Sequence, residues 1–322
     1  MGRITLEELS KEASRALVLG IGGGGDIVGT LPTAQYLEAH DVETIKGGIT
    51  WERSVMDSSP GPRKIEEIKN CEQISDTTAL ANPETETRNG IKLTESSVSG
   101  VLDQETFLLD LNKGVKGAVR GLEEASEELD IDFIVGVDVG GDVLGRGDEE
   151  GLQSMLSDSM TLSALKEIDL PTVLGVLGFG VDGELSLDNL MKNSAEIASA
   201  DGFLGARGIH PSDLEVMRKA VENTATECSE LALDAAEGGY GDIEIRDGRR
   251  EVNISLLSAV TFYFDLETVV QEVNNIALAI LDTESIYEAH EILVEEGIPT
   301  ELKYERSIKN KRRDEEREKD ER

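Results

Sequence analysis

Short apolar runs rich in β-branched residues alternate along this chain with longer segments of helical periodicity, and this alternation limits the possible folds most strongly. The apolar runs cover residues 16–22, 42–50, 132–140, 172–180 and 202–208, and helical segments include 26–40, 113–129, 151–168 and a stretch from Ser186. Strands separated by helices form a parallel sheet that the helices cover. We therefore predict an α/β protein with a Rossmann-like three-layer fold, in which a mostly parallel sheet carries helices on both faces.

The remaining segments add two hairpins and two helices to this prediction. Asn89-Gly90 and Asp247-Gly248 are dipeptides typical of hairpin turns. Residues 211–237 predict one long helix, with a proline where the first turn tolerates it. Residues 266–281 predict another helix, whose apolar side chains recur on one face and pack in the core.

The chain has no segment with the composition of a linker between domains. We therefore predict a single α/β domain over residues 1–304. Residues 305–322 carry eight basic and seven acidic side chains with one apolar residue. Such a segment offers nothing to a hydrophobic core, so we expect a charged C-terminal tail that is either a frayed helix or disordered.

Three of the predicted strands are each followed by glycines and then by acidic residues. The carboxyl ends of parallel strands share one edge of a sheet, and ligands bind there where the strand order reverses. Each loop alone is also typical of a tight turn with an aspartate helix cap. Taken together, the loops predict a binding site built from Gly22, Gly23, Gly24, Gly25 and Asp26, from Asp138, Gly140, Gly141 and Asp142, and from Asp182.

The first of these loops combines features that favour different ligands. Gly20, Gly22 and Gly25 fit the G-x-G-x-x-G fingerprint of dinucleotide binding, and Glu52 is the candidate acid for the ribose. Asp26, however, lies in the first helical turn, where it would repel a pyrophosphate. NAD or another nucleotide therefore remains an alternative cofactor.

A cluster of carboxylates favours a hard cation instead. Magnesium takes oxygen ligands, often one or two carboxylates together with the phosphates of a substrate. We predict Asp138 and Asp142 as metal ligands and as candidate catalytic groups. Trp51, the single tryptophan of the chain, would either stack on a base or sugar or pack in the core.

Basic groups near the predicted strand ends would orient an anionic ligand. Arg53 and Arg207 are the candidates, because a guanidinium pairs with phosphate or carboxylate through a bidentate fork. His210 follows a strand end and is the histidine that we consider for catalysis. His40 and His290 are expected at the surface, since they lie on helices that end in charged residues.

The charge balance excludes some classes of partner. The 322 residues include 66 acidic and 31 basic side chains, which gives a formal net charge of -35. Nucleic acid and anionic membranes would be repelled by such a surface. An acidic, lysine-poor surface around an ordinary core is what a salt-rich cytosol favours, so we expect a halophilic protein.

The cysteines and the apolar segments point to an intracellular protein. Cys71 and Cys228 lie far apart without the spacing of a metal site, so we expect reduced packing residues. Neither a signal segment nor an apolar run long enough to span a bilayer is evident. We therefore expect a cytoplasmic protein.

The motifs resemble a known family. "GIGGGGDIVGTLP", "GGITWER", "GVDVGGDVLG", "DEEGLQSMLSDSMTL" and "GFGVDGELS" are similar to an archaeal family of uncharacterised proteins, domain of unknown function 1152. The resemblance covers nearly the whole chain apart from the charged tail. It implies an archaeal cytosolic protein of α/β type and supplies no reaction.

These features together favour an enzyme that acts on a phosphate-bearing or nucleotide-like small molecule with a divalent cation, as a transferase or hydrolase. Two alternatives stay open: a dinucleotide-binding oxidoreductase, and a non-catalytic sensor that binds a nucleotide. The sequence also leaves open a homo-oligomer.

The net charge generates a prediction about salt. Repulsion among exposed acids destabilises the folded chain in dilute buffer, and salt screens it over about 10 Å at roughly 0.1 M. We expect the melting temperature to rise substantially between low and molar potassium chloride, measured by circular dichroism. An unchanged melting temperature would contradict the halophilic interpretation.

Overall fold

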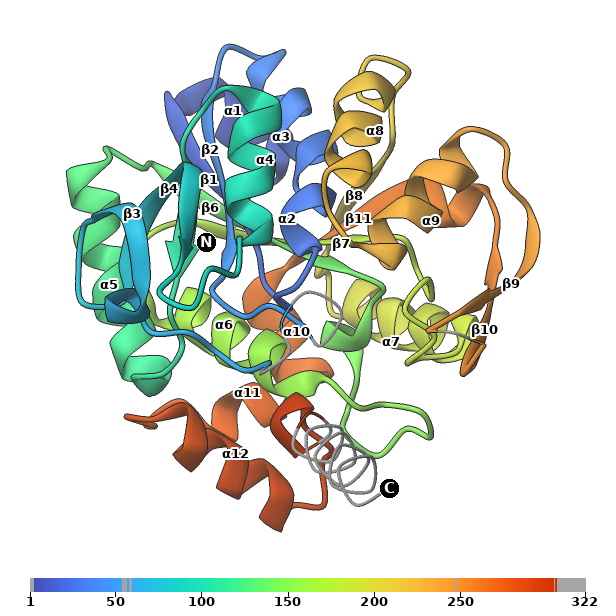
Figure 1. The fold of residues 1–322 in the computed structure, drawn as a ribbon. Coiled ribbons are helices and arrows are strands. Elements are labelled where there is room, and N and C mark those ends of the chain that lie inside the picture. Colours follow the sequence, from blue (N-terminus) through green and yellow to red (C-terminus); the bar gives the residue numbers. More distant parts are fainter. Residues whose placement is uncertain (1–2, 54–56, 58–59, 247, 304, 306–322) are drawn as a thin grey trace, which may run out of the picture.

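The computed structural model describes residues 3–53, 57, 60–246, 248–303 and 305, and within them the central element is a nine-stranded sheet (Figure 1). Its strand order is β3-β4-β5-β2-β1-β6-β7-β11-β8. The strands are β1 Arg15–Gly20, β2 Glu43–Ile49, β3 Ile68–Gln73, β4 Thr78–Thr87, β5 Thr106–Leu109, β6 Phe133–Val139, β7 Thr172–Leu177, β8 Phe203–Gly208 and β11 Val260–Asp265. A separate two-stranded sheet pairs β9 Gly241–Ile245 with β10 Arg250–Ile254.

The middle of the large sheet is parallel, as predicted. Strands β5, β2, β1, β6 and β7 run in one direction, whereas β3, β4 and β11 introduce antiparallel pairs at the flanks. The chain leaves β1 towards β2 on one side and later adds β6 and β7 on the other side. The strand order therefore reverses between β1 and β6, which is where ligands bind in open α/β sheets.

Helices pack on both faces of this sheet, which confirms the three-layer prediction. The helices are α1 Leu6–Glu12, α2 Asp26–Gly29, α3 Leu31–Glu38, α4 Thr94–Leu102, α5 Gly114–Glu128, α6 Met155–Glu167, α7 Leu187–Ser199, α8 Leu214–Glu222, α9 Glu227–Ala236, α10 Leu266–Glu272, α11 Ile276–Ala279 and α12 Ile286–Glu295. Strand β1 shows why both faces are covered. Its side chains alternate: Leu17 and Leu19 join the core cluster of α5 and α6, whereas Ala16 and Val18 join that of α1 and α3.

Helix α6 lies at the centre of the larger core. Every residue from Met155 to Leu165 is buried, so the helix has no solvent-facing side over this length. Helices surrounded by protein are usually apolar all round. The one charged side chain within this stretch is Asp158, a buried carboxylate in the first turn of the helix.

Two predicted long helices are interrupted. The segment 211–237 divides into α8 and α9, because Thr226 is extended and its side chain caps α9 by accepting from the Ser229 amide. The segment 266–281 divides into α10 and α11 at the buried Asn274. The Asn274 amide group donates to the Val143 carbonyl (2.9 Å), and its Oδ1 accepts from the Ala277 amide (3.2 Å).

Other local predictions have mixed outcomes. His40 is exposed as expected, but His290 is buried, and its Nδ1 is 2.8 Å from the Thr300 hydroxyl. Strands β9 and β10 form the predicted hairpin, although Asp247 of its turn lies outside the described residues. An antiparallel bridge between Glu86 and Lys92 forms around the predicted Asn89-Gly90 turn.

The ends of the chain and its helices complete the description. Glu305, which was predicted to begin the tail, is buried, and residues 306–322 lie outside the described part of the chain. Within the described residues, no helix has both the length and the apolar character needed to cross a membrane.

The packing of α2 on β6 generates a prediction. A Cβ added at Gly29 would lie 2.2 Å from Val139 Cγ2 but 3.7 Å from Val139 Cβ. We expect Gly29→Ala to lower the free energy of unfolding by about 1–3 kcal/mol through overpacking. In Gly29→Ala/Val139→Ala the clash is removed, so the loss should be smaller than the sum of the single losses. Urea unfolding in molar potassium chloride measures this, and strictly additive losses would contradict the packing.

Candidate functional site

Three carboxylates meet where the strand order of the sheet reverses. Asp26 follows β1 at the start of α2, Asp138 lies in β6, and Asp158 reaches the same place from α6. One oxygen of each lies within 4.8 Å of the others, a spacing that can hold a metal ion. Asp138 and Asp158 are buried and Asp26 is half-buried, so solvent approaches the cluster from the side of Asp26. We call Asp26, Asp138 and Asp158 the carboxylate centre.

Asp158 is held in place by the beginning of α6. The amides of Leu156 and Ser157 both donate to the carboxylate of Glu301 at 2.9 Å, which satisfies the first turn of the helix. The Ser157 hydroxyl donates to the Ile21 carbonyl at the end of β1 (2.9 Å). This hydrogen bond joins the start of α6 to the residue that precedes the first glycine loop.

Asp158 was not predicted from the sequence. The sequence does contain a signal for this residue, because "MLSDSMTLSAL" (155–165) has one charged residue among apolar and small ones. A lone carboxylate in a helix that is otherwise uncharged for three turns indicates a buried charge, and buried charges are paired or bind metals.

Glycines of the first loop and of the loop after β6 make room for the carboxylates of the site. A Cβ at Gly22 would lie 2.7 Å from Asp26 Oδ2 and 3.0 Å from Asp158 Oδ1. Gly140 has φ +128°, and a Cβ there would lie 2.4 Å from Asp182 Cγ. In both places only glycine allows the backbone to come so close to a carboxylate.

The amides of the same loop are largely engaged within the protein. The Gly22 amide donates to Asp26 Oδ2 (2.8 Å), the Gly24 amide to the Trp51 carbonyl (3.0 Å), and the Gly25 amide to the Gly23 carbonyl (3.0 Å). These donors are therefore not directed at a phosphate. The acid, rather than a set of open amides, is the distinctive feature of the loop.

A second group of acids lies beside the centre. Burial and the neighbouring Asp138 carboxylate help to raise the pKa of Asp142, and the Ser154 hydroxyl donates to Asp142 Oδ2 (3.0 Å). The Ser154 amide donates to Glu184 (3.0 Å), and the Glu184 amide to Asp182 Oδ1 (3.0 Å). The three predicted loops therefore do converge, through Asp26, Asp138 with Asp142, and Asp182.

Burial and mutual repulsion keep this site from being fully ionised. Burial raises the pKa of Asp26 and the pKa of Asp182 to about 7. Burial together with neighbouring carboxylates raises the pKa well above its usual range at Asp138, Asp142 and Asp158. At neutral pH the site therefore holds protons unless a cation replaces them.

Three carboxylate oxygens of the site have no hydrogen-bond donor among the described residues. Among the described residues, no donor reaches Asp138 Oδ2, Asp158 Oδ1 or Asp182 Oδ2, and all three atoms are buried. A buried carboxylate oxygen without a partner is strongly unfavourable. A divalent cation with oxygen ligands would supply that partner, so these residues fit the predicted metal.

Arginines surround the acids on two sides. Arg53 contacts the Gly22 carbonyl, lies 5.0 Å above the Trp51 ring, and is 3.7 Å from both Glu301 and Glu305. The β9–β10 hairpin adds two arginines that the sequence analysis did not consider. Arg250 donates to the Asp182 carbonyl (2.9 Å), and the charge of Arg246 acts on Asp26 and Asp182.

Some candidates have other contacts. Glu52 is buried and accepts from the amide and the hydroxyl of Thr94, so both of its oxygens serve the start of α4. Arg207 donates to the Pro32 carbonyl (2.6 Å) and to Asp213 (3.1 Å). His210 is exposed, with its Nδ1 2.8 Å from Ser212. None of these contacts involves the carboxylate centre.

Trp51 is a packing residue with a polar anchor. Its side chain is buried in the larger core, and Nε1 donates to the Glu305 carboxylate at 3.1 and 3.2 Å. Because the ring is buried, it offers no open face on which a base could stack.

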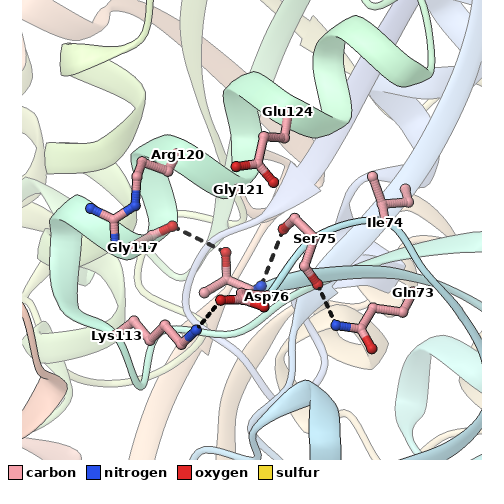
Figure 2. A pocket seen from close by; sticks show the side chains of 10 residues that line it. Gln73, Ile74, Ser75, Asp76, Lys113, Gly117, Arg120, Gly121 and Glu124 are labelled. Atoms are coloured by element: carbon pink, nitrogen blue, oxygen red, sulfur yellow. Dashed lines mark hydrogen bonds and ion pairs between the residues drawn. The ribbon is translucent and has the colours of Figure 1, made fainter.

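A separate hollow lies between the β3–β4 turn and α5 (Figure 2). It encloses about 580 Å³, and Lys113 is paired with Asp76 across it at 2.6 Å. Its lining comprises Gln73, Ile74, Ser75, Asp76, Thr77, Lys113, Gly117, Arg120, Gly121 and Glu124. No member of the carboxylate centre lines this hollow, so it is a distinct surface feature.

The raised pKa values predict how stability varies with pH. Unfolded carboxyl groups titrate near pH 4, whereas Asp26 and Asp182 do so at about 7 when folded. Their contribution is therefore fully present below about pH 4 and is lost as the pH rises through 7, by about 1.4 kcal/mol per pH unit per proton. We expect cation-free protein to lose stability mainly between about pH 4 and 7 in urea unfolding.

A matched pair of variants tests the origin of this pH dependence. Asp182→Asn should reduce the slope, because Asn does not titrate. Glu123→Gln, at an exposed position on α5, should leave it unchanged. Equal slopes for the two variants would contradict the assignment to the buried site.

Comparison with known proteins gives one match. The model of the family described as protein of unknown function (DUF1152) matches residues 17–309. No curated protein and no solved structure matches the chain. Since the matched segment contains the sheet, the glycine loops and the carboxylate centre, the protein belongs to the DUF1152 family.

Proposed function

We propose that the protein binds a divalent cation at Asp26, Asp138 and Asp158 and uses it to hold a phosphate-bearing or nucleotide-like small molecule. The observation that carries this proposal is the convergence of these carboxylates within 4.8 Å, two of them with a buried oxygen that has no donor among the described residues. Magnesium is the cation of choice, because it combines carboxylate ligands with substrate phosphates.

Asp142 has a supporting role in this proposal. It was predicted as a metal ligand, but its Oδ2 accepts from the Ser154 hydroxyl (3.0 Å), and it is not one of the three carboxylates whose oxygens lie within 4.8 Å of one another. A carboxylate beside a ligand commonly tunes that ligand. We propose Asp158 as a metal ligand in place of Asp142, which was predicted from the sequence.

The chemistry that suits such a site is phosphoryl transfer or hydrolysis. A bound cation would polarise a phosphoryl oxygen and neutralise charge that develops on it. Arg53 and the arginines of the β9–β10 hairpin would orient the anion from the sides. The dinucleotide alternative has less support, because Glu52 is occupied by Thr94 and the Gly22 and Gly24 amides are bonded internally.

We further propose that this activity operates in the salt-rich cytosol of an archaeon. The net charge of -35 and the resemblance of the sequence motifs to an archaeal family support that setting. A high potassium concentration screens the surface acids. A divalent cation at the buried centre is screened much less, so the two effects are separable.

A cation titration tests the proposal. We expect Mg²⁺ or Mn²⁺ alone to raise the melting temperature in molar potassium chloride. At a cation concentration of a hundred times the dissociation constant, the free energy of unfolding should rise by about 2.7 kcal/mol. Asp138→Asn and Asp158→Asn should abolish this gain. Both should fold at least as well as the parent without cation, because each removes one of several like charges.

The remaining variants separate a ligand from a supporting residue. Asp142→Asn should weaken cation binding without abolishing it, and Glu123→Gln should behave as the parent. Asp26→Asn retains an oxygen for the Gly22 amide, so a loss of cation binding there reports on ligation. If parent, Asp138→Asn and Asp158→Asn titrate identically with Mg²⁺ and Mn²⁺, the metal site does not exist.

A further inference from the structure

We infer that the anion held at this centre carries two linked phosphoryl groups, one bound by Arg53 and the other by Arg246. This inference rests on the proposed cation site and names its substrate class as a diphosphate-bearing molecule. It depends on where the two guanidinium groups are anchored and on the loop that lies between them.

Arg53 borders the glycine loop on one side. A Cβ at Gly24 would lie 3.0 Å from Arg53 Cγ, and one at Gly23 would lie 3.7 Å from Arg53 Nη2. The side chain is about a quarter exposed, at 25%, and its distances to Glu301 and Glu305 are both 3.7 Å. One Nη2–H of Arg53 donates to the Gly22 carbonyl, and the two ion pairs are longer than direct hydrogen bonds, so the guanidinium retains other donors for a ligand.

Arg246 lies near the other end of the loop, beside the start of α9. That start packs against Gly25, where an added Cβ would lie 2.2 Å from Thr226 Oγ1. Arg246 contacts the same start of α9, with Nη2 3.7 Å from Cys228 Sγ and Nε 3.5 Å from Glu227. Its φ of +55° is unusual for a non-glycine residue.

The half-exposed residues Gly23–Asp26 therefore have one arginine near each end of their loop. Both positive charges favour the ionised form of Asp26. Each guanidinium is anchored by acids of its own, Glu301 and Glu305 beside Arg53 and Glu227 beside Arg246. An anion that contacts the cation at this loop would therefore meet a separately anchored guanidinium at each end.

A diphosphate fits this arrangement better than a single phosphate. When a diphosphate chelates one cation, each phosphoryl group gives it one oxygen and presents its remaining oxygens to opposite sides. Two separately anchored guanidinium groups match those two sides, each through a bidentate fork. The surrounding acids repel any anion in the absence of the cation, so binding must depend on it.

The experiment uses inorganic pyrophosphate and orthophosphate as probes, with the full chain and Mn²⁺ in molar potassium chloride. Isothermal titration measures Mn²⁺ alone first, and then each probe in saturating Mn²⁺. We expect pyrophosphate to bind at least about tenfold more tightly than orthophosphate, and neither to bind in the presence of a chelator.

Two variants test the arginines without removing the cation site. Arg53→Lys keeps the charge beside Glu301 and Glu305 but loses the fork. Arg246→Asn places a residue that tolerates positive φ. Each should weaken pyrophosphate binding by about tenfold and reduce the preference over orthophosphate, while Mn²⁺ alone binds as in the parent. Arg218→Gln, which loses an exposed pair with Glu237 on the surface, is the control and should change neither value.

The outcomes separate the two proposals. If Mn²⁺ does not bind the parent protein, the cation site fails and this inference fails with it. If Mn²⁺ binds but pyrophosphate and orthophosphate bind equally, or if both arginine variants match Arg218→Gln, the cation site stands and the diphosphate inference is overturned.

Discussion

The burial of several carboxylates at one edge of the sheet is the constraint on which the rest of this site depends. Asp26, Asp138 and Asp158 lie within 4.8 Å of one another, with Asp142 and Asp182 close by. Like charges in a low-dielectric environment repel strongly, so protons or a cation must be present at neutral pH. The surrounding backbone is arranged to allow this crowding. Gly22 and Gly140 leave space that any side chain would fill.

The end of the described chain is tied to the same constraint. Glu301 accepts from the first amides of α6 and thereby fixes the helix that presents Asp158. Glu305 accepts from Trp51 and, with Glu301, flanks Arg53. One short C-terminal stretch therefore positions both an acid of the centre and the arginine beside it. Residues far apart in sequence share one electrostatic environment.

The prediction from sequence succeeded where the pattern was local and repeated. Alternation identified the parallel strands β1, β2, β6 and β7 but not the short parallel strand β5, and the strand–glycine–acid order identified three loops at strand ends. It was wrong where a single polar residue interrupts a predicted helix, as at Thr226 and Asn274, because a buried cap overrides apolar periodicity. His290 was misplaced for a related reason, since its partner Thr300 comes from a later turn of the chain.

The fold class, the acidic composition and the strand-end loops that supply Asp26 and Asp138 can be predicted from the sequence alone. These follow from periodicity and from short motifs, which depend on neighbours in the chain. Tertiary packing was needed to bring Asp158 to Asp26 and Asp138, and to bring Arg246 to the start of α9 beside the glycine loop. Their positions depend on how α6 packs beneath β1 and how the β9–β10 hairpin packs against α9 (Figure 1). Such contacts join distant segments through burial and charge, which no local pattern records.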